Sequence, residues 1–296
     1  MKKNIISLVL VSAMAVSLTA CGSKAEETTA ASTTEATETA EATAEAAVEA
    51  AKPEAEAEAE ETAGGTFTVG FDQEFPPMGF VGDDGEYTGF DLELAQEVAK
   101  RLELEYVPQP IAWDAKDMEL ESGTIDCVWN GFTMNGREDS YTWTEAYMDN
   151  SQVFVVSAES GIKDLADLSG KIVEVQADSS AEAALKDNPE LAGTFAALQT
   201  TPDYNTAFMD LEMGAVDAIA MDVIVAGYQL EQREDGASYV ILEETLASEE
   251  YGVGFKKGNE KLRDKVQAAL EEMAADGTMA EISDKWFGRD VTTIGK

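Results

Sequence analysis

The sequence predicts an α/β fold with two similar lobes, and two related stretches carry that prediction. "GTIDCVWN" (residues 123–130) and "GAVDAIAMD" (residues 214–222) each follow a predicted helix and continue from a Gly into an apolar strand. Each strand ends on a polar side chain, Asn130 or Asp222. Ligands of open α/β sheets bind outside the carboxyl ends of the strands, so two lobes facing each other through these ends would form a binding cleft.

The first elements follow from the residue pattern in chain order. "TFTVG" at 66–70 alternates in polarity and ends in Gly, which indicates a first strand. Residues 78–90 hold an Asp-Gly turn that favours two short paired strands. Apolar side chains recur every fourth position from Phe90 to Leu102, which predicts an amphipathic helix with an acidic first turn.

A strand near 106–111 and a short helix over 115–121 lead to the first related stretch. We expect Asp126 and Asp217, which follow the Gly turns, to cap local backbone rather than to contact a ligand. The apolar run before Asp222 is typical of a buried strand. A carboxylate at the exit of such a strand costs free energy unless a positive group meets it, so Asp222 raises the question of its partner.

Composition excludes several function classes. The chain has 296 residues, 44% of them hydrophobic, which is enough to bury the core of two lobes. A formal net charge of −39 argues against a nucleic-acid partner, because phosphate backbones are bound by Lys and Arg. There is no His, which excludes a Ser-His-Asp triad and His-ligated metals. We expect neither a metal nor a cofactor, since no other cluster of metal-ligand residues is present.

The N-terminus resembles the leader of a bacterial lipoprotein. A basic "MKKN" precedes an apolar run that is too short for a membrane-spanning helix, and "LTAC" ends at Cys21. The lipobox resemblance implies a signal peptide over 1–20 and a diacylglyceryl thioether on Cys21, with palmitate as an acyl chain. The alternative is an ordinary secretory signal with an incidental Cys. With Cys21 lipidated, Cys127 has no disulfide partner and is expected to be a small core residue.

Residues 21–65 follow as an acidic tether rich in Ala, Glu and Thr, without aromatic side chains before the folded domain. Such composition cannot bury a core, so we expect disorder with transient helical turns. This tether would hold the folded domain away from a membrane.

Four stretches resemble the solute-binding proteins of polar-amino-acid ABC transporters, the bacterial extracellular solute-binding protein family 3. They are "TFTVGFDQEFPPMGF", "GEYTGFDLELAQEVAKRL", "ESGTIDCVWNGFT" and "DGTMAEISDKWFG", and the resemblance covers residues 66–290. It implies a two-lobed periplasmic-binding-protein-like clamshell of type II. Lobe one would be 66–151 plus 249–296 and lobe two 152–248. Two crossing hinge strands would lie near "QVFVV" and "YGVGF".

The same resemblance implies a ligand clamp. Arg137 would grip the α-carboxylate with Thr133 beside it, although the loop before Arg137 is one residue shorter than the family pattern. Asn130 and Gly131 would contact the ligand by side chain or backbone. Arg137 as a surface ion-pair residue is the alternative interpretation. The chemistry agrees with the clamp, since a planar guanidinium fork suits a carboxylate.

In the second lobe, Ser179 and Ser180 match the helix start that meets the carboxylate, or they are only helix caps. Asp222 matches the acid that holds the α-amino group, so the ligand's own ammonium would be its partner. Phe75 and Trp113 match the aromatic pair around the ligand's side chain, with Trp113 as simple core the alternative.

Three further residues each have two interpretations, one inside and one outside the ligand site. Trp129 lies mid-strand and is expected in the core more than in the site. Asp72 and Glu74 flank Phe75 and either reach the ligand's side-chain tip or are solvated loop charges. Two acids there would disfavour aspartate and glutamate. They would favour lysine or arginine, with glutamine or cystine next.

The resulting hypothesis is a monomeric extracytoplasmic lipoprotein, not an enzyme, that binds a polar or basic amino acid between its lobes. It would deliver the amino acid to a membrane-embedded ABC permease with a cytoplasmic ATPase. It would be anchored only by its lipid to the outer face of the cytoplasmic membrane, most consistent with a Gram-positive cell. The alternatives are an enzyme of the cyclohexadienyl or prephenate dehydratase type on the same fold, and a sensory surface lipoprotein.

Overall fold

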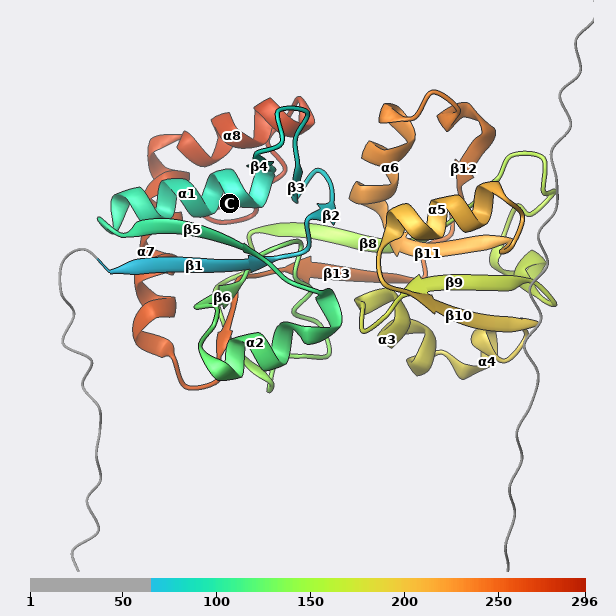
Figure 1. The fold of residues 1–296 in the computed structure, drawn as a ribbon, viewed down its shortest axis with the longest axis horizontal. Coiled ribbons are helices and arrows are strands. Elements are labelled where there is room, and N and C mark those ends of the chain that lie inside the picture. Colours follow the sequence, from blue (N-terminus) through green and yellow to red (C-terminus); the bar gives the residue numbers. More distant parts are fainter. Residues whose placement is uncertain (1–64) are drawn as a thin grey trace, which may run out of the picture. The chain divides into compact units, whose positions relative to one another are not determined.

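The computed structural model describes residues 65–296 (Figure 1). The predicted signal peptide, Cys21 and the tether up to residue 64 lie outside the described residues. Within 65–296, no helix combines the length and the apolar character that crossing a membrane requires.

The first lobe is built on a five-stranded sheet with the order β5-β1-β6-β14-β7. Its strands are β1 (Thr66–Phe71), β5 (Glu105–Pro110), β6 (Cys127–Val128), β7 (Tyr141–Trp143) and β14 (Gly254–Lys256). β1 runs parallel to β5 and β6, and β14 runs antiparallel to β6 and β7. The helices of this lobe are α1 (Phe90–Arg101), α2 (Lys116–Ser122), α7 (Glu260–Asp276) and α8 (Thr278–Phe287). α1 and α8 cover one side of the sheet and α2 the other (Figure 1).

A small sheet of β2 (Glu74–Phe75), β3 (Gly79–Val81) and β4 (Tyr87–Thr88) stands at the edge of the first lobe. It contains the predicted pair of short strands around the Asp-Gly turn. The predicted helix is α1, in which Phe90, Leu94 and Val98 are fully buried. The four-residue spacing therefore placed the apolar face correctly, because it repeats on one side of a helix.

The second lobe is built on a six-stranded sheet with the order β10-β9-β11-β8-β12, in which β13 also pairs with β8. Its strands are β8 (Met148–Ser157), β9 (Ile172–Gln176), β10 (Ala197–Thr201), β11 (Ala218–Asp222), β12 (Tyr239–Ile241) and β13 (Ala247–Tyr251). Its helices are α3 (Ser180–Asp187), α4 (Pro189–Ala192), α5 (Tyr204–Glu212) and α6 (Val223–Gln232). Three short 3-10 turns complete the elements of residues 65–296: η1 (Trp113–Ala115), η2 (Leu165–Leu168) and η3 (Gly236–Ser238).

The two related stretches take the same structure in the two lobes. α2 ends at Gly123 before β6, and α5 is followed by Gly214 before β11; the two glycines have φ angles of 77° and 71°. Asp126 Oδ2 accepts from the N–H of Thr68 at 2.7 Å, and Asp217 Oδ2 accepts from the N–H of Ile172 at 2.8 Å. Each carboxylate thus satisfies a backbone donor at the start of the neighbouring parallel strand, which confirms the expected structural role.

Two strands cross between the lobes, as predicted, but the second lies earlier in the chain than expected. β8 and β13 pair antiparallel from Ala247 opposite Gln152 to Tyr251 opposite Met148. "QVFVV" lies within β8, whereas of "YGVGF" only Tyr251 belongs to the crossing strand β13. The rest leads into β14, which begins at Gly254; a Cβ at Gly254 would lie 2.7 Å from Phe132 Cε1, so this position suits Gly.

Both sheets contribute to a buried core, and Cys127 is part of it. The Cys127 side chain is fully buried and forms no disulfide. Burial strongly raises the pKa of its thiol, so the residue is inert packing, as expected.

Candidate ligand-binding site

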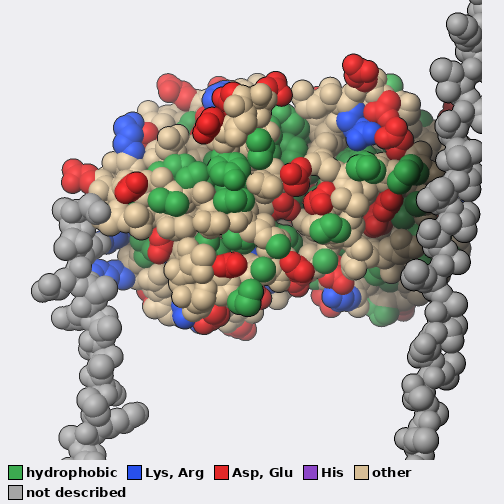
Figure 2. Space-filling model, in the orientation of Figure 1, with side chains coloured by type: hydrophobic (Ala, Val, Ile, Leu, Met, Phe, Trp, Pro, Cys, Tyr) green, Lys and Arg blue, Asp and Glu red, His purple; other side chains and the backbone are tan. Residues whose placement is uncertain are grey.

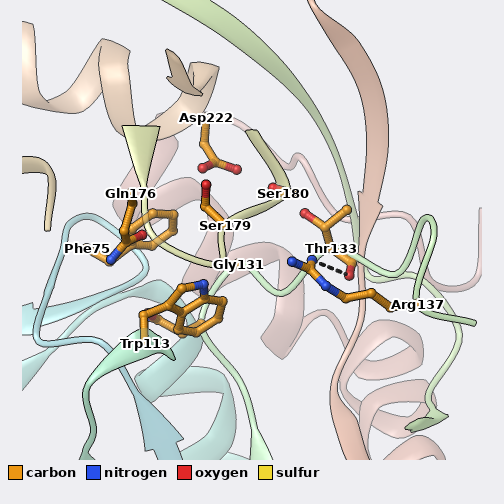
Figure 3. Close-up of a pocket in the computed structure, with 10 residues that line it drawn as sticks. Phe75, Trp113, Gly131, Thr133, Arg137, Gln176, Ser179, Ser180 and Asp222 are labelled. Carbon is orange, nitrogen blue, oxygen red and sulfur yellow. Dashed lines mark hydrogen bonds between the residues drawn. The ribbon is translucent and has the colours of Figure 1, made fainter. Parts of the chain in front are cut away.

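A small cavity lies where the carboxyl ends of strands from both lobes meet (Figure 3). Its lining residues are Phe75, Trp113, Asn130, Gly131, Thr133, Arg137, Gln176, Ser179, Ser180 and Asp222. Of the ten principal site residues predicted from the sequence, nine line this cavity, and Gln176 takes the place of Asp72.

The topology explains why these residues converge. Asn130 and Gly131 directly follow β6 in the first lobe, and Asp222 ends β11 in the second. Gln176 ends β9, and Ser180 begins α3 beside it. Parallel strands deliver their carboxyl ends to the same edge of a sheet, so each sheet presents its polar residues to the other.

Arg137 lies at one end of the cavity without a carboxylate partner. Its guanidinium donates to the carbonyl oxygens of Thr133 and Asp178, both at 3.3 Å, and sits 5.4 Å from the centre of the Phe132 ring. Among residues 65–296, no carboxylate lies within ion-pair distance of it. The cationic fork is held in place by neutral groups, and the shorter loop still brings it into the cavity.

The neighbouring polar groups also suit an anion. Thr133 is buried, and its Oγ1 has no hydrogen-bond partner among the described residues. Ser179 caps α3: its Oγ accepts from the N–H of Glu182 at 3.1 Å. Ser179 is therefore a helix cap, whereas Ser180 is the first residue of α3 and its Oγ accepts from Gln152 Nε2 at 2.9 Å. Both line the cavity, and their contact with a ligand carboxylate stays a prediction.

Asp222 lies at the other end, buried among neutral donors. Its Oδ1 accepts from Asn150 Nδ2 at 2.7 Å, from Gln152 Nε2 at 2.8 Å and from the Tyr251 hydroxyl at 2.5 Å. Burial raises the pKa of this carboxyl to about 8, and the nearby charge of Glu249 adds to the rise. No cationic side chain of residues 65–296 pairs with it.

Glu249 makes the charge imbalance larger. It is buried on β13, and its Oε1 accepts from the same two amides, Asn150 and Gln152, at 2.6 Å each. Two carboxyls therefore share two neutral donors on β8. Such a pair holds a proton unless a cation arrives, because burial disfavours two uncompensated negative charges.

Phe75 and Trp113 provide flat apolar walls on the side of the cavity away from Arg137 (Figure 3). Trp113 packs edge-on against Phe132 with ring centres 5.5 Å apart, which fixes its orientation. Gly131 lies against Phe75 with a φ of 57°, and a Cβ there would lie 2.9 Å from Phe75 Cε1. A side chain at this position would clash, so only Gly leaves the cavity open.

Asp72 does not line the cavity, which corrects the placement expected from the sequence. Its carboxylate is buried and accepts from Gln176 Nε2 at 2.6 Å, so the Gln176 side chain lies between it and the cavity. Burial raises the pKa of Asp72 to about 6. Glu74 is turned away from the cavity and accepts from Asn205 Nδ2 of the other lobe.

Trp129 is fully buried and packs against Tyr147, as expected for a core residue. Beside it, Asp91 lies at the start of α1 and accepts from the N–H of Gly131 at 2.6 Å and from the Tyr147 hydroxyl at 2.8 Å. Burial raises the pKa of Asp91 to about 7. Asp91 therefore fixes the backbone of Gly131 from behind and is not merely an exposed helix-start acid.

Lys116 is a further residue that sequence reasoning missed. Its side chain is only 1% exposed, and its Nζ forms an ion pair with Asp178 across the lobes. Nζ also donates to the carbonyl oxygens of Asp178 at 3.2 Å and Trp113 at 3.3 Å. Burial lowers the pKa of Lys116, and Asp178 opposes that shift. A Lys three residues after an aromatic on a short helix is the only sequence signal, and it usually means a solvated face.

Acidic side chains gather around the junction of the lobes on the face shown in Figure 2, where Lys and Arg lie mostly toward the periphery. A hollow at this junction is lined by Asp72, Glu74, Asp114 and Asp203, together with neutral residues. This field attracts cationic ligands and repels anionic ones, most strongly at low salt.

Comparison with known proteins places this geometry in a family. Residues 67–289 match the bacterial extracellular solute-binding proteins, family 3. The chain is 36% identical over 231 residues to the L-cystine-binding protein TcyJ of Escherichia coli (strain K12), covering 77% of this chain and 85% of that protein.

Solved structures agree with the family match. An ABC uptake transporter substrate binding protein from Streptococcus pneumoniae with bound histidine has a TM-score of 0.74 and 38% identity. The match covers 77% of this chain and 94% of that one. An ancestral arginine-binding protein bound to arginine has a TM-score of 0.70 and 37% identity, over 76% of this chain and 99% of that one.

Proposed function

The chain belongs to the bacterial extracellular solute-binding proteins, family 3, and on that premise we propose that it binds one free α-amino acid in the cavity between its lobes. It is an extracytoplasmic binding protein rather than an enzyme, and it hands its ligand to the permease of an ABC transporter. The observation that supports this proposal is that Arg137 and Asp222 both line the cavity and that neither has an oppositely charged side-chain partner among residues 65–296.

A zwitterionic amino acid would supply an oppositely charged partner for Arg137 and for Asp222 at once. Its carboxylate would accept from the Arg137 fork, from Thr133 Oγ1 and from the start of α3 at Ser180. Its ammonium would pair with Asp222, so the partner missing from the protein would be supplied by the ligand. Charge-assisted hydrogen bonds of this kind are stronger than neutral ones, and they are stronger still in a cavity shielded from water.

The ligand's side chain would lie between Phe75 and Trp113, which favours a chain with flat or methylene surfaces. The relatives named above bind cystine, histidine and arginine, and a polar or basic amino acid is the class we propose here. The acidic junction agrees with this class and disfavours aspartate and glutamate.

A prephenate-type dianion fits the cavity poorly. It carries no amine to pair with Asp222, and its second carboxylate would meet the acidic side of the junction. The dehydratase alternative therefore has no observation in its favour among the described residues.

The test is a thermal-shift screen of the purified protein against all amino acids and cystine, followed by calorimetry of the best ligand. Binding to the native state raises the melting temperature by mass action. Two analogues of that ligand serve as controls, one without the α-amine and one with the carboxylate as a neutral amide. Both should lose most of the affinity. An analogue lacking either charge that binds as well as the parent would remove the zwitterion clamp.

We also propose the boundaries of the lobes, the oligomeric state and the membrane anchor. The lobes would comprise 66–151 plus 249–296 and 152–248, and the protein would act as a monomer. Cys21 would carry the lipid that anchors it to the outer face of the membrane of a Gram-positive cell. Cys21→Ala should release the protein into the medium, and its unchanged retention on the membrane would contradict lipid anchoring.

A further inference from the structure

We propose that Gln176 selects the ligand's side chain, by offering its Oε1 as a hydrogen-bond acceptor that favours side chains ending in N–H donors, cationic ones most. The inference rests on the proposed binding of an amino acid and names the class of side chain. It assigns selectivity to an amide that stands in front of Asp72, rather than to direct contact with that acid.

The orientation of the Gln176 amide is fixed by two acceptors. Nε2 donates to Asp72 Oδ2 at 2.6 Å and to the carbonyl oxygen of Pro202 at 3.0 Å. A carbonyl can only accept, so the NH₂ side must face Pro202 whatever the protonation of Asp72. Oε1 then points to the remaining direction, and Gln176 lines the cavity on that side (Figure 3).

No protein donor among the described residues reaches Oε1. The residue itself is only 2% exposed, so bulk water has little access. An acceptor on the cavity wall loses contact with water when a ligand fills the cavity, so a ligand N–H that bonds to it is favoured over a group that cannot. An aliphatic side chain leaves Oε1 without a partner, and a carboxylate presents a second acceptor to it.

Asp72 strengthens this acceptor from behind. The chain of contacts runs from the Asp72 carboxylate through the Gln176 amide to the ligand, and hydrogen bonds in such a chain polarise one another. The buried negative charge thus makes Oε1 a better acceptor and favours a positive donor over a neutral one. Arginine, histidine in its cationic form and the far ammonium of cystine all present such donors, and glutamine presents a neutral one.

The link between Gln176 and Asp72 also joins the lobes, since Gln176 ends β9 of the second lobe and Asp72 follows β1 of the first. The contact with Pro202 lies within the second lobe, whereas the contact with Asp72 forms only when the lobes meet. A ligand therefore meets the acceptor polarised by Asp72 only in the arrangement in which the two lobes are in contact.

The experiment compares ligands that share the zwitterion and differ at the tip: arginine, glutamine, glutamate and methionine. In the wild-type protein, arginine and glutamine should bind more tightly than glutamate and methionine. Gln176→Met should reduce the ratio of arginine to methionine affinity about tenfold to a hundredfold, which corresponds to loss of a charge-assisted hydrogen bond. Measuring the ratio within one protein cancels any effect of the substitution on folding or closure.

Gln199→Met is the matched control, because Gln199 is exposed on the neighbouring strand β10 and does not line the cavity. It should leave all four affinities unchanged. Asp72→Asn should lower the preference for arginine over glutamine while keeping glutamine ahead of methionine.

The outcomes separate this inference from the proposed function. A wild-type protein that binds no amino acid overturns the proposed function itself. Binding that favours glutamate or methionine, or an arginine-to-methionine ratio unchanged in Gln176→Met, overturns the role of Gln176 alone. An unchanged arginine-to-glutamine ratio in Asp72→Asn overturns the contribution of Asp72.

Discussion

Replacing Asp222 by Asn should make the ligand-free protein more stable and should remove most of its ligand binding. The Asp222 carboxyl is buried next to Glu249 and has no cationic side chain as partner among the described residues. Asn has nearly the same shape, keeps one acceptor oxygen and cannot ionise. A buried acid whose cationic partner is supplied by the ligand is therefore expected to lower the free energy of unfolding of the ligand-free protein.

The size of the effect follows from the pKa of Asp222, which burial raises from 3.8 to about 8. An acid whose pKa is raised in the folded state contributes stability below the unfolded pKa and loses it as pH rises through the folded pKa. Each pH unit above 3.8 costs about 1.4 kcal/mol, so at pH 7 the cost of Asp222 is at most about 4 kcal/mol. Glu249 shares the same two amides, so the realised cost is smaller than this bound.

The assay is thermal unfolding of the ligand-free protein between pH 5 and pH 8. Asp222→Asn should melt several degrees higher than wild type at pH 7, and the difference should shrink toward pH 5. Asp72 and Asp91 also have raised pKa values and lower stability in the same direction, so the comparison is the difference between variant and wild type. Calorimetry should show affinity reduced about a hundredfold or more.

Asp217→Asn is the control, since Asp217 directly precedes the same strand, accepts from the N–H of Ile172, pairs with Lys171 on the surface and does not line the cavity. It should lower the melting temperature modestly and leave affinity unchanged. The reasoning is refuted if Asp222→Asn melts below wild type without ligand at pH 7, or if it keeps wild-type affinity.

Three further substitutions address the other parts of the site. Arg137→Ala should weaken binding about a hundredfold with little change in ligand-free melting temperature, because its partners are backbone carbonyls; undiminished affinity in calorimetry would exclude Arg137 from the clamp. Lys116→Met should weaken binding of every ligand about equally, by about tenfold, because the closed form loses its ion pair with Asp178; a change in ligand preference instead would show direct contact with the ligand. Gly131→Ala should lower both affinity and melting temperature, because a Cβ at that φ angle meets Phe75; a variant with wild-type values of both would contradict the close packing seen here.

The local residue pattern predicts the fold and the two strand ends at the cavity, and the family resemblance predicts most of the other lining residues. The repeated helix, Gly and strand units place Asn130 and Asp222 at strand ends wherever the lobes meet. Aromatic and Gly positions such as Phe75 and Gly131 follow the family pattern in chain order. Their ligand contacts stay predictions, since the structure gives their positions and not their occupants.

The residues that were missed or misplaced depend on contacts between the lobes. Gln176 has the pattern of an ordinary strand-end residue, and its contact with Asp72 of the other lobe cannot be read from the linear sequence. Lys116 has the pattern of an exposed helical Lys, and it is buried only because Asp178 of the second lobe meets it. Asp72 was expected in the lining because nothing in a linear sequence shows that another side chain stands in front of it.

The position of Asp222 in the fold also connects ligand charge with closure. Its hydrogen-bond donors come from the two crossing strands: Asn150 and Gln152 from β8, and Tyr251 from β13, which also carries Glu249. A change in the charge of this carboxyl therefore acts directly on the strands about which the lobes move. An ammonium that pairs with Asp222 removes the repulsion from Glu249 and stabilises the arrangement in which both strands hold the acid. The differential affinity of the ligand for the closed form, which any closure mechanism requires, then has a physical source at the crossing strands themselves.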